Sequence, residues 1–96
     1  MANKNLEDLE IGDILLVRAQ REGMPYLPVF PSRRGDLTLN ISDGIMLNCL
    51  GLKELQPGAS FYEMEIVTGK DSGDIVLVSR TLQRYLEKIP SKKRIR

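Results

Sequence analysis

Short apolar segments separated by turn residues run along most of this chain. Residues 14–19 (ILLVRA) are aliphatic and lie between two glycine-containing turns, a pattern that predicts a β-strand. Both faces of this strand begin apolar, so we expect it to lie in the interior of a sheet. Residues 1–12 are polar with one weak apolar edge, and they predict a lead-in containing one helical turn.

A first hairpin is predicted over residues 37–50. Residues 37–41 (LTLNI) alternate strictly between apolar and polar, which indicates a half-buried strand. A turn at 42–44 (SDG) connects this strand to a second one at 45–50 (IMLNCL). The glycines and proline that bracket residues 51–58 predict a loop after the second strand.

A second hairpin is predicted over residues 60–79. Its strands are 60–67 (SFYEMEIV) and 74–79 (DIVLVS), and the turn between them is 69–73 (GKDSG). The first strand alternates, so one face is apolar and the other acidic. The apolar face holds Tyr62, Met64 and Ile66, and the acidic face holds Glu63 and Glu65.

Residues 20–35 predict a long connection. Pro25, Pro28 and Pro31 recur at every third position, the period of a polyproline II helix. Because three prolines remove three backbone donors, this segment is not expected to form a central strand. The apolar residues between the prolines indicate that the connection packs on the core, with Tyr26 and Phe30 holding it in place.

The end of the chain predicts a short helix followed by a basic tail. Leu82, Leu86 and Ile89 have helical spacing over residues 80–89. Ser79 is a suitable N-terminal cap, and Pro90 ends the helix.

These elements predict an all-β fold class with about five strands and one short C-terminal helix. The sheet would be small and either strongly bent or closed into a barrel, since closing it removes its unpaired edges. The predicted organisation is a lead-in at 1–12, a single β-rich domain at 13–89 and a basic tail at 90–96.

The order of these elements resembles an SH3-like small β-barrel over residues 10–86. The chain has an opening strand at 11–17 (IGDILLV), a long irregular loop at 20–35, two hairpins, and then residues 73–79 (GDIVLVS) leading into a short helix. The resemblance implies a binding module for protein or nucleic acid. Compact barrels of this kind are common among phage-encoded proteins, which suggests the same origin here. The family's peptide groove usually contains Trp, and this chain has none.

Composition excludes several kinds of chemistry. The 96 residues include no His and one Cys, Cys49. Ser-His-Asp and Cys-His catalysis are therefore excluded, and so are zinc sites built from imidazole or several thiolates. We expect no enzyme activity, no metal, no cofactor and no small-molecule substrate. Cys49 itself is expected to be a buried core thiol.

The sequence also predicts where the protein resides. It begins without a basic and then apolar leader, and no apolar run is long enough to span a bilayer. We expect a cytoplasmic protein without membrane contact, in the host cytoplasm or the virion if it is phage-encoded.

Charge is divided unevenly along the chain. Residues 80–96 hold seven basic residues and one acidic residue, a net charge of +6, so residues 1–79 carry −5. The basic tail predicts a contact to nucleic-acid phosphates, a contact to an acidic protein surface, or only a solvated end. The candidate binding residues are Arg33, Arg34, Arg84, Lys88, Lys92, Lys93, Arg94 and Arg96.

Three weaker patterns are interpreted structurally. Residues 28–33 (PVFPSR) fit a Pro-x-x-Pro-x-Arg peptide ligand, but a rigid internal loop is favoured. Asp43, Asp71 and Asp74 are interpreted as turn residues and not as a cation site. Glu63 and Glu65 are expected to form a solvated face.

Two hypotheses for function follow from these patterns. The first is a protein-binding module acting as an adaptor, an inhibitor or a small subunit of an assembly. The second is a nucleic-acid-binding barrel that uses the basic tail. Because the acidic body would repel a duplex, we favour a protein partner over nucleic acid.

Overall fold

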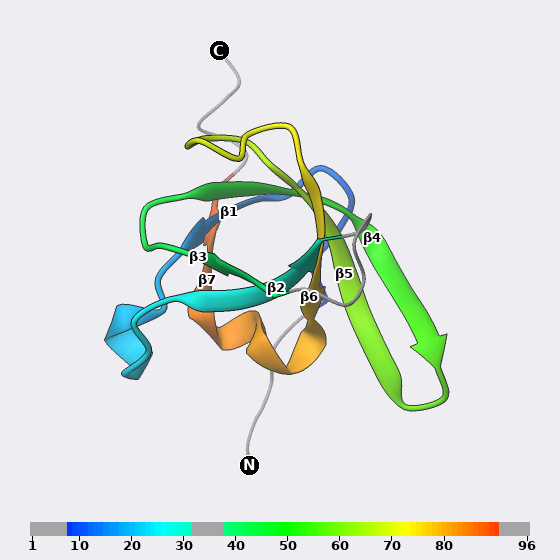
Figure 1. Ribbon diagram of the computed structural model, residues 1–96. Coiled ribbons are helices and arrows are strands. Elements are labelled where there is room, and N and C mark those ends of the chain that lie inside the picture. The colour runs from blue at the N-terminus through cyan, green and yellow to red at the C-terminus, as the bar shows by residue number, and fades with distance from the viewer. Residues whose placement is uncertain (1–7, 32–37, 91–96) are drawn as a thin grey trace.

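The structure, a computed structural model, describes residues 8–31 and 38–90. Within these ranges the chain forms one antiparallel sheet of seven strands in the order β3-β2-β6-β5-β4-β1-β7, curled into a half-barrel (Figure 1). The mainly-β fold class is therefore confirmed, with seven strands where about five were expected. The strands are β1 (Ile14–Val17), β2 (Leu27–Pro31), β3 (Leu39–Ile41), β4 (Met46–Gln56), β5 (Ala59–Ile66), β6 (Ile75–Ser79) and β7 (Leu86–Ile89). Two 3-10 turns, η1 (Gln20–Glu22) and η2 (Arg80–Tyr85), complete the element order.

Strand β1 lies in the interior of the sheet, as its sequence predicts. It pairs with β4 on one side and with β7 on the other. Leu15 and Val17 point into the core and are fully buried, while Ile14 and Leu16 alternate with them on the outer face and are half-buried. The strand ends at Val17 and not at Ala19.

The predicted hairpin over residues 60–79 is confirmed. β5 and β6 pair in a continuous antiparallel register that runs from Phe61 opposite Ser79 to Glu65 opposite Ile75. Tyr62, Met64 and Ile66 are buried, as the alternation of this strand predicts. The remaining face of β5 is the outer surface of the half-barrel.

The predicted hairpin over residues 37–50 is wrong. β3 pairs with β2, whereas β4 pairs with β1 and β5. The turn between β3 and β4 is fixed against the end of β1, where the Gly44 N–H donates to the Val17 carbonyl at 3.0 Å. The Asp43 carboxylate also accepts from the Ala19 N–H at 2.7 Å. These long-range bonds turn the chain away from β3, so local alternation could not reveal the true partners.

The predicted loop at 51–58 is also wrong, because β4 continues to Gln56. Its register shifts at Gly51, whose φ of 140° fits a β-bulge. A two-residue turn at Pro57 and Gly58 then leads directly into β5. The resulting β4–β5 arm (residues 51–60) projects beyond the curled sheet at the lower right of Figure 1.

The proline-rich segment contains a strand, contrary to expectation. β2 pairs with β3 over Leu27–Val29 and with β6 at Phe30 and Pro31. A proline is tolerated in a strand where the ladder does not use its missing N–H, so a strand whose two parts pair with different partners can hold two prolines. Leu27 and Val29 are buried, which confirms that this segment packs on the core.

Within that segment, the residues that hold it in place differ from those expected. Tyr26 and Phe30 are partly exposed, and Leu27 and Val29 provide the packing. Because Pro28 and Pro31 lie in the sheet, they are not available as a free polyproline ligand.

The predicted helix at 80–89 is wrong in its second half. Only Arg80–Tyr85 is helical, as a 3-10 turn, and Leu86–Ile89 is strand β7 paired with β1. The Ser79 side chain does cap the turn by accepting from the Thr81 N–H at 3.4 Å. The Arg18 N–H, just after β1, donates to the Tyr85 carbonyl at 2.8 Å, and β1 pairs with β7. These bonds replace the backbone hydrogen bonds that a longer helix would have made internally.

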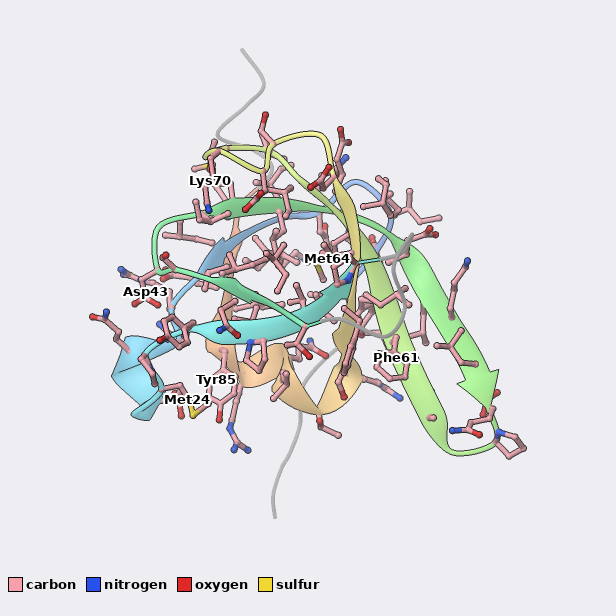
Figure 2. All side chains as sticks on the ribbon, viewed as in Figure 1. Met24, Asp43, Phe61, Met64, Lys70 and Tyr85 are labelled. Carbon is pink, nitrogen blue, oxygen red and sulfur yellow. The ribbon has the colours of Figure 1, made fainter. Side chains whose placement is uncertain are left out.

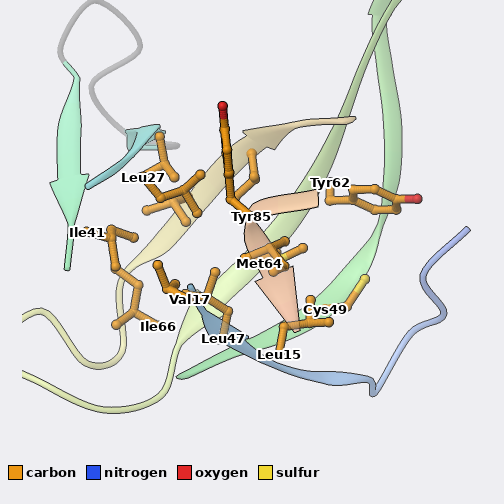
Figure 3. Packing of buried hydrophobic residues seen from close by; sticks show 14 of the residues in the cluster. Leu15, Val17, Leu27, Ile41, Leu47, Cys49, Tyr62, Met64, Ile66 and Tyr85 are labelled. Carbon is orange, nitrogen blue, oxygen red and sulfur yellow. The ribbon is translucent and has the colours of Figure 1, made fainter. Parts of the chain in front are cut away.

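One hydrophobic cluster fills the concave side of the sheet (Figure 3). It draws on every strand and on η2, and it is mostly aliphatic, as the low aromatic content predicts. Its buried members are Leu15, Val17, Ala19, Leu27, Val29, Ile41, Leu47, Cys49, Tyr62, Met64, Ile66, Val76, Val78, Tyr85 and Leu86.

Replacing Leu86 with alanine should destabilise the protein. Leu86 is buried opposite Val17 in the β1–β7 ladder, so Leu86→Ala leaves a cavity that costs about 2–5 kcal/mol. Urea unfolding would measure the loss, with Ile11→Ala as the control because Ile11 is 77% exposed. Equal stability of the two variants would show that β7 does not close the core.

Candidate functional site

A hollow lies where β5 extends farther than its neighbour β6. This cleft has a volume of about 410 Å³ and lies between the β4–β5 arm and the start of η2. Phe61, labelled in Figure 2, marks its position at the base of the arm. The cleft is lined by Gly58, Ala59, Ser60, Phe61, Ser79, Arg80 and Thr81.

Backbone groups of β5 border this cleft. β6 ends at Ser79 opposite Phe61, so within residues 8–31 and 38–90 no strand pairs with Ala59 and Ser60 on this side. Both residues pair only with β4. Successive residues of an antiparallel ladder direct their N–H and C=O groups to opposite sides. One of these two residues therefore directs its N–H and C=O groups toward the cleft, where no strand of the described residues pairs with them.

The opposite wall is formed by the chain as it leaves β6. The Ser79 and Thr81 hydroxyls lie 2.9 Å apart and hold the first turn of η2 together. This turn carries the backbone away from β5, and the ladder stops. The wall thus consists of two hydroxyl-bearing residues, Ser79 and Thr81, and of Arg80 between them.

An aromatic pair lies on the outer face beside the cleft. Phe30 of β2 and Phe61 of β5 meet edge to face, with ring centroids 6.1 Å apart and an interplanar angle of 75°. Phe30 is 39% exposed, and the cleft reaches Phe61. The two rings offer an apolar surface next to the free backbone groups.

Tyr62 joins the core to the segment that precedes β1. Its ring is fully buried, and Figure 3 shows its hydroxyl at the margin of the cluster, directed away from the core. This hydroxyl accepts from the Leu9 N–H at 3.1 Å and lies 3.3 Å from Gln83 Oε1 and 3.4 Å from Asp8 Oδ1. A phenol has one proton, so it donates to Gln83 or to Asp8 at any one time.

Arg80 forms an ion pair with Asp8. The side chains are about half exposed, 46% for Arg80 and 58% for Asp8. The pair links the wall of the cleft to the segment before β1.

Two of the predicted binding residues, Arg84 and Lys88, lie in the part of the chain described. Arg84 lies over the Tyr85 ring at 5.2 Å, and its hydrogen bond to the Tyr85 hydroxyl raises its pKa. Lys88 pairs with Asp13 at 3.4 Å, so the two cations have different partners. The other six candidates lie outside the described residues: Arg33, Arg34, Lys92, Lys93, Arg94 and Arg96.

Sequence reasoning missed the cleft residues. Ser60 and Phe61 were included in a predicted strand, and Arg80 was counted only in the charge of the C-terminal segment. The cleft arises from the unequal ends of β5 and β6, and the available signal was the greater length of the first apolar segment of that hairpin.

The weaker candidates have structural roles. Cys49 is fully buried, as expected. Asp43 binds the backbone before η1, and Asp71 and Asp74 lie at the turn where the Asp74 N–H donates to the Asp71 carbonyl at 3.1 Å. Glu63 of β5 pairs with Lys53 of β4 at 3.9 Å. Within the described ranges, no three His, Cys, Asp or Glu side chains gather where they could hold a metal ion.

A smaller hollow of about 120 Å³ lies at the other end of the half-barrel, between the turn after β3 and the turn after β5. Its floor is apolar, with Ile41, Ile45 and Ile66, and its rim includes Thr68 and Lys70. Thr68 already serves the fold, because its hydroxyl accepts from the Met46 N–H at 3.0 Å.

Comparisons with protein-family models, with curated proteins and with solved structures gave no match to this chain. The geometry above therefore carries the functional argument by itself. None of the helical segments described has the length and apolar character required to cross a membrane.

Removing the Tyr62 hydroxyl should loosen the segment before β1. Tyr62→Phe leaves the Leu9 N–H without its acceptor, and an unsatisfied group of this kind costs about 1–3 kcal/mol. Urea unfolding would show the loss of stability, and faster amide hydrogen exchange at Leu9 would show its location. Tyr26→Phe is the control because Tyr26 is exposed. Unchanged exchange at Leu9 would contradict the tether.

The Cys49 thiol should be inert in the folded protein. Burial raises its pKa, so the reactive thiolate is scarce at neutral and mildly alkaline pH. A disulfide reagent added at pH 8 should label the native protein far more slowly than the protein in urea. Equal labelling rates would show that the thiol is accessible.

Proposed function

We propose that this chain is a non-enzymatic protein-binding module that takes an extended segment of a partner protein into the cleft between β5 and η2. The observation that carries the proposal is the free edge at Ala59 and Ser60, which opens directly into that cleft. An added strand forms main-chain hydrogen bonds to such an edge, and the neighbouring pockets select its side chains.

The size and surface of the cleft support a peptide ligand. A volume of about 410 Å³ accommodates a few residues of extended chain and falls within the range typical of ligand pockets. Phe61 and Phe30 supply an apolar contact beside the edge. Aromatic side chains are enriched among residues that dominate binding energy at protein interfaces.

We further propose that the domain is an SH3-like small barrel. The strands β7-β1-β4-β5-β6 form a continuous run of neighbours, and a 3-10 turn precedes the last strand. Strand β2 lies within the segment expected to hold the long loop, and it pairs with β3, which follows that segment. A phage origin and a cytoplasmic location stay predictions.

The nucleic-acid hypothesis also stays a prediction. It depends on Arg33, Arg34 and the tail, which lie outside the described residues. Among the described cations, Arg18, Arg21, Lys53 and Lys88 each form an ion pair with a carboxylate, which reduces the charge available for phosphates. The described part of the chain therefore favours a protein ligand.

Peptides selected from a random ten-residue display library should bind at this cleft. Backbone amide shifts measured by NMR on adding a selected peptide should concentrate in residues 58–61 and 79–81. Phe61→Ala should weaken binding about tenfold, the loss expected of a central aromatic contact. Val67→Ala is the matched control, because Val67 is an exposed apolar residue after the far end of β5.

Two results would contradict this function. The first is a selection that yields no binding peptide. The second is a set of amide shifts located away from the cleft, with Phe61→Ala and Val67→Ala behaving alike.

A further inference from the structure

The charge of the cleft comes from a single side chain. Among its seven lining residues only Arg80 is ionised, and the others are apolar, small or hydroxylic. Glu54 lies near the tip of the arm, but its carboxylate is engaged by the Gly58 N–H at 3.2 Å. A segment that enters this cleft therefore meets a positive group and no opposing negative group in the lining.

The present partner of Arg80 is Asp8, which comes from outside the sheet. Asp8 belongs to the stretch before β1, whereas Glu87 and Glu63 hold their arginine and lysine partners from within strands β7 and β5. Both Asp8 and Arg80 are half exposed, so water screens the attraction between them. An exposed pair of this kind contributes little to stability and is readily exchanged.

The surroundings of Asp8 also permit its replacement. Its second contact, the Tyr62 hydroxyl, has Gln83 Oε1 as an alternative acceptor at 3.3 Å. The Leu9 N–H anchors the backbone to the same hydroxyl independently of the Asp8 carboxylate. The carboxylate can therefore leave Arg80 without exposing an unsatisfied buried group.

We propose that the cleft selects an extended segment that carries an acidic side chain, and that Asp8 is the internal ligand which this side chain displaces from Arg80. The guanidinium forms a planar, bidentate ion pair with a carboxylate. A lysine or a neutral side chain of the ligand cannot form this pair with Arg80. Phe61 takes an apolar side chain of the same segment. This inference rests on the proposed function and names the chemistry of the ligand.

Two matched libraries of ten-residue peptides would test the inference. They are identical except that one fixed position holds Glu in the first and Lys in the second. The full chain should bind more peptides from the Glu library than from the Lys library, and it should bind them with higher affinity. Isothermal titration would then compare the best Glu peptide with its Gln analogue on the variants.

The variants should move affinity in opposite directions. Arg80→Gln should weaken the Glu peptide at least about fivefold and bring it level with its Gln analogue. Asp8→Asn keeps an acceptor near Tyr62 but removes the competing charge, so it should strengthen the Glu peptide about two- to fivefold. Lys53→Gln is the control, because it removes a cation that is paired with Glu63 outside the cleft lining.

The outcomes separate this inference from the proposed function. Peptides that shift residues 58–61 without preferring Glu, or that bind Arg80→Gln as well as the parent, overturn the inference and leave the binding module standing. An affinity that does not rise in Asp8→Asn overturns the role of Asp8. Peptides that bind elsewhere, or none at all, overturn both.

Discussion

The fold depends on the hydroxyl group at the end of the buried Tyr62 side chain. Tyr62 fills the core from β5, and burying its ring brings a hydroxyl to the margin of the cluster, where it requires partners. Three groups supply these partners: the Leu9 N–H, the Gln83 side chain and the Asp8 carboxylate. One hydroxyl thereby contacts both the segment before β1 and η2. The position of Arg80 at the cleft follows from this arrangement, because Arg80 begins η2 and pairs with Asp8.

The cleft follows from the path that the chain must take to add β7 to the sheet. β7 has to reach β1, so β6 stops at Ser79 and a 3-10 turn carries the chain across the end of the half-barrel. β5 does not have to stop at this point, and it continues into the arm, where it pairs with β4. The difference in length leaves backbone groups of Ala59 and Ser60 beside a wall of side chains. A site for an extended segment is thus a consequence of the path by which the chain reaches β7.

The sequence predicts those parts of the fold that local alternation determines. Burial of alternate residues holds in β5, where Tyr62, Met64 and Ile66 are all enclosed, and the β5–β6 hairpin follows from one turn. It fails where distant backbone groups decide. The turn at 42–44 is held by the end of β1. Residues 86–89 pair with β1 although Leu82, Leu86 and Ile89 have helical spacing. The cleft was missed for the same reason. The alternation of apolar and polar residues does not show that β5 extends beyond the end of β6.

A free ladder edge attracts any extended chain, and proteins keep such edges short to avoid aggregation. Beside the cleft, the edge of β5 that no described strand pairs has only two residues, Ala59 and Ser60, and the register of the neighbouring β4 shifts at Gly51. Backbone pairing over so short an edge is weak and independent of sequence, so side chains must supply both affinity and selection. Phe61 and Arg80 are the two positioned to do so. The Asp8 carboxylate, which already pairs with Arg80, then competes with the ligand for the guanidinium. A segment without an acidic side chain gains no binding energy by displacing Asp8.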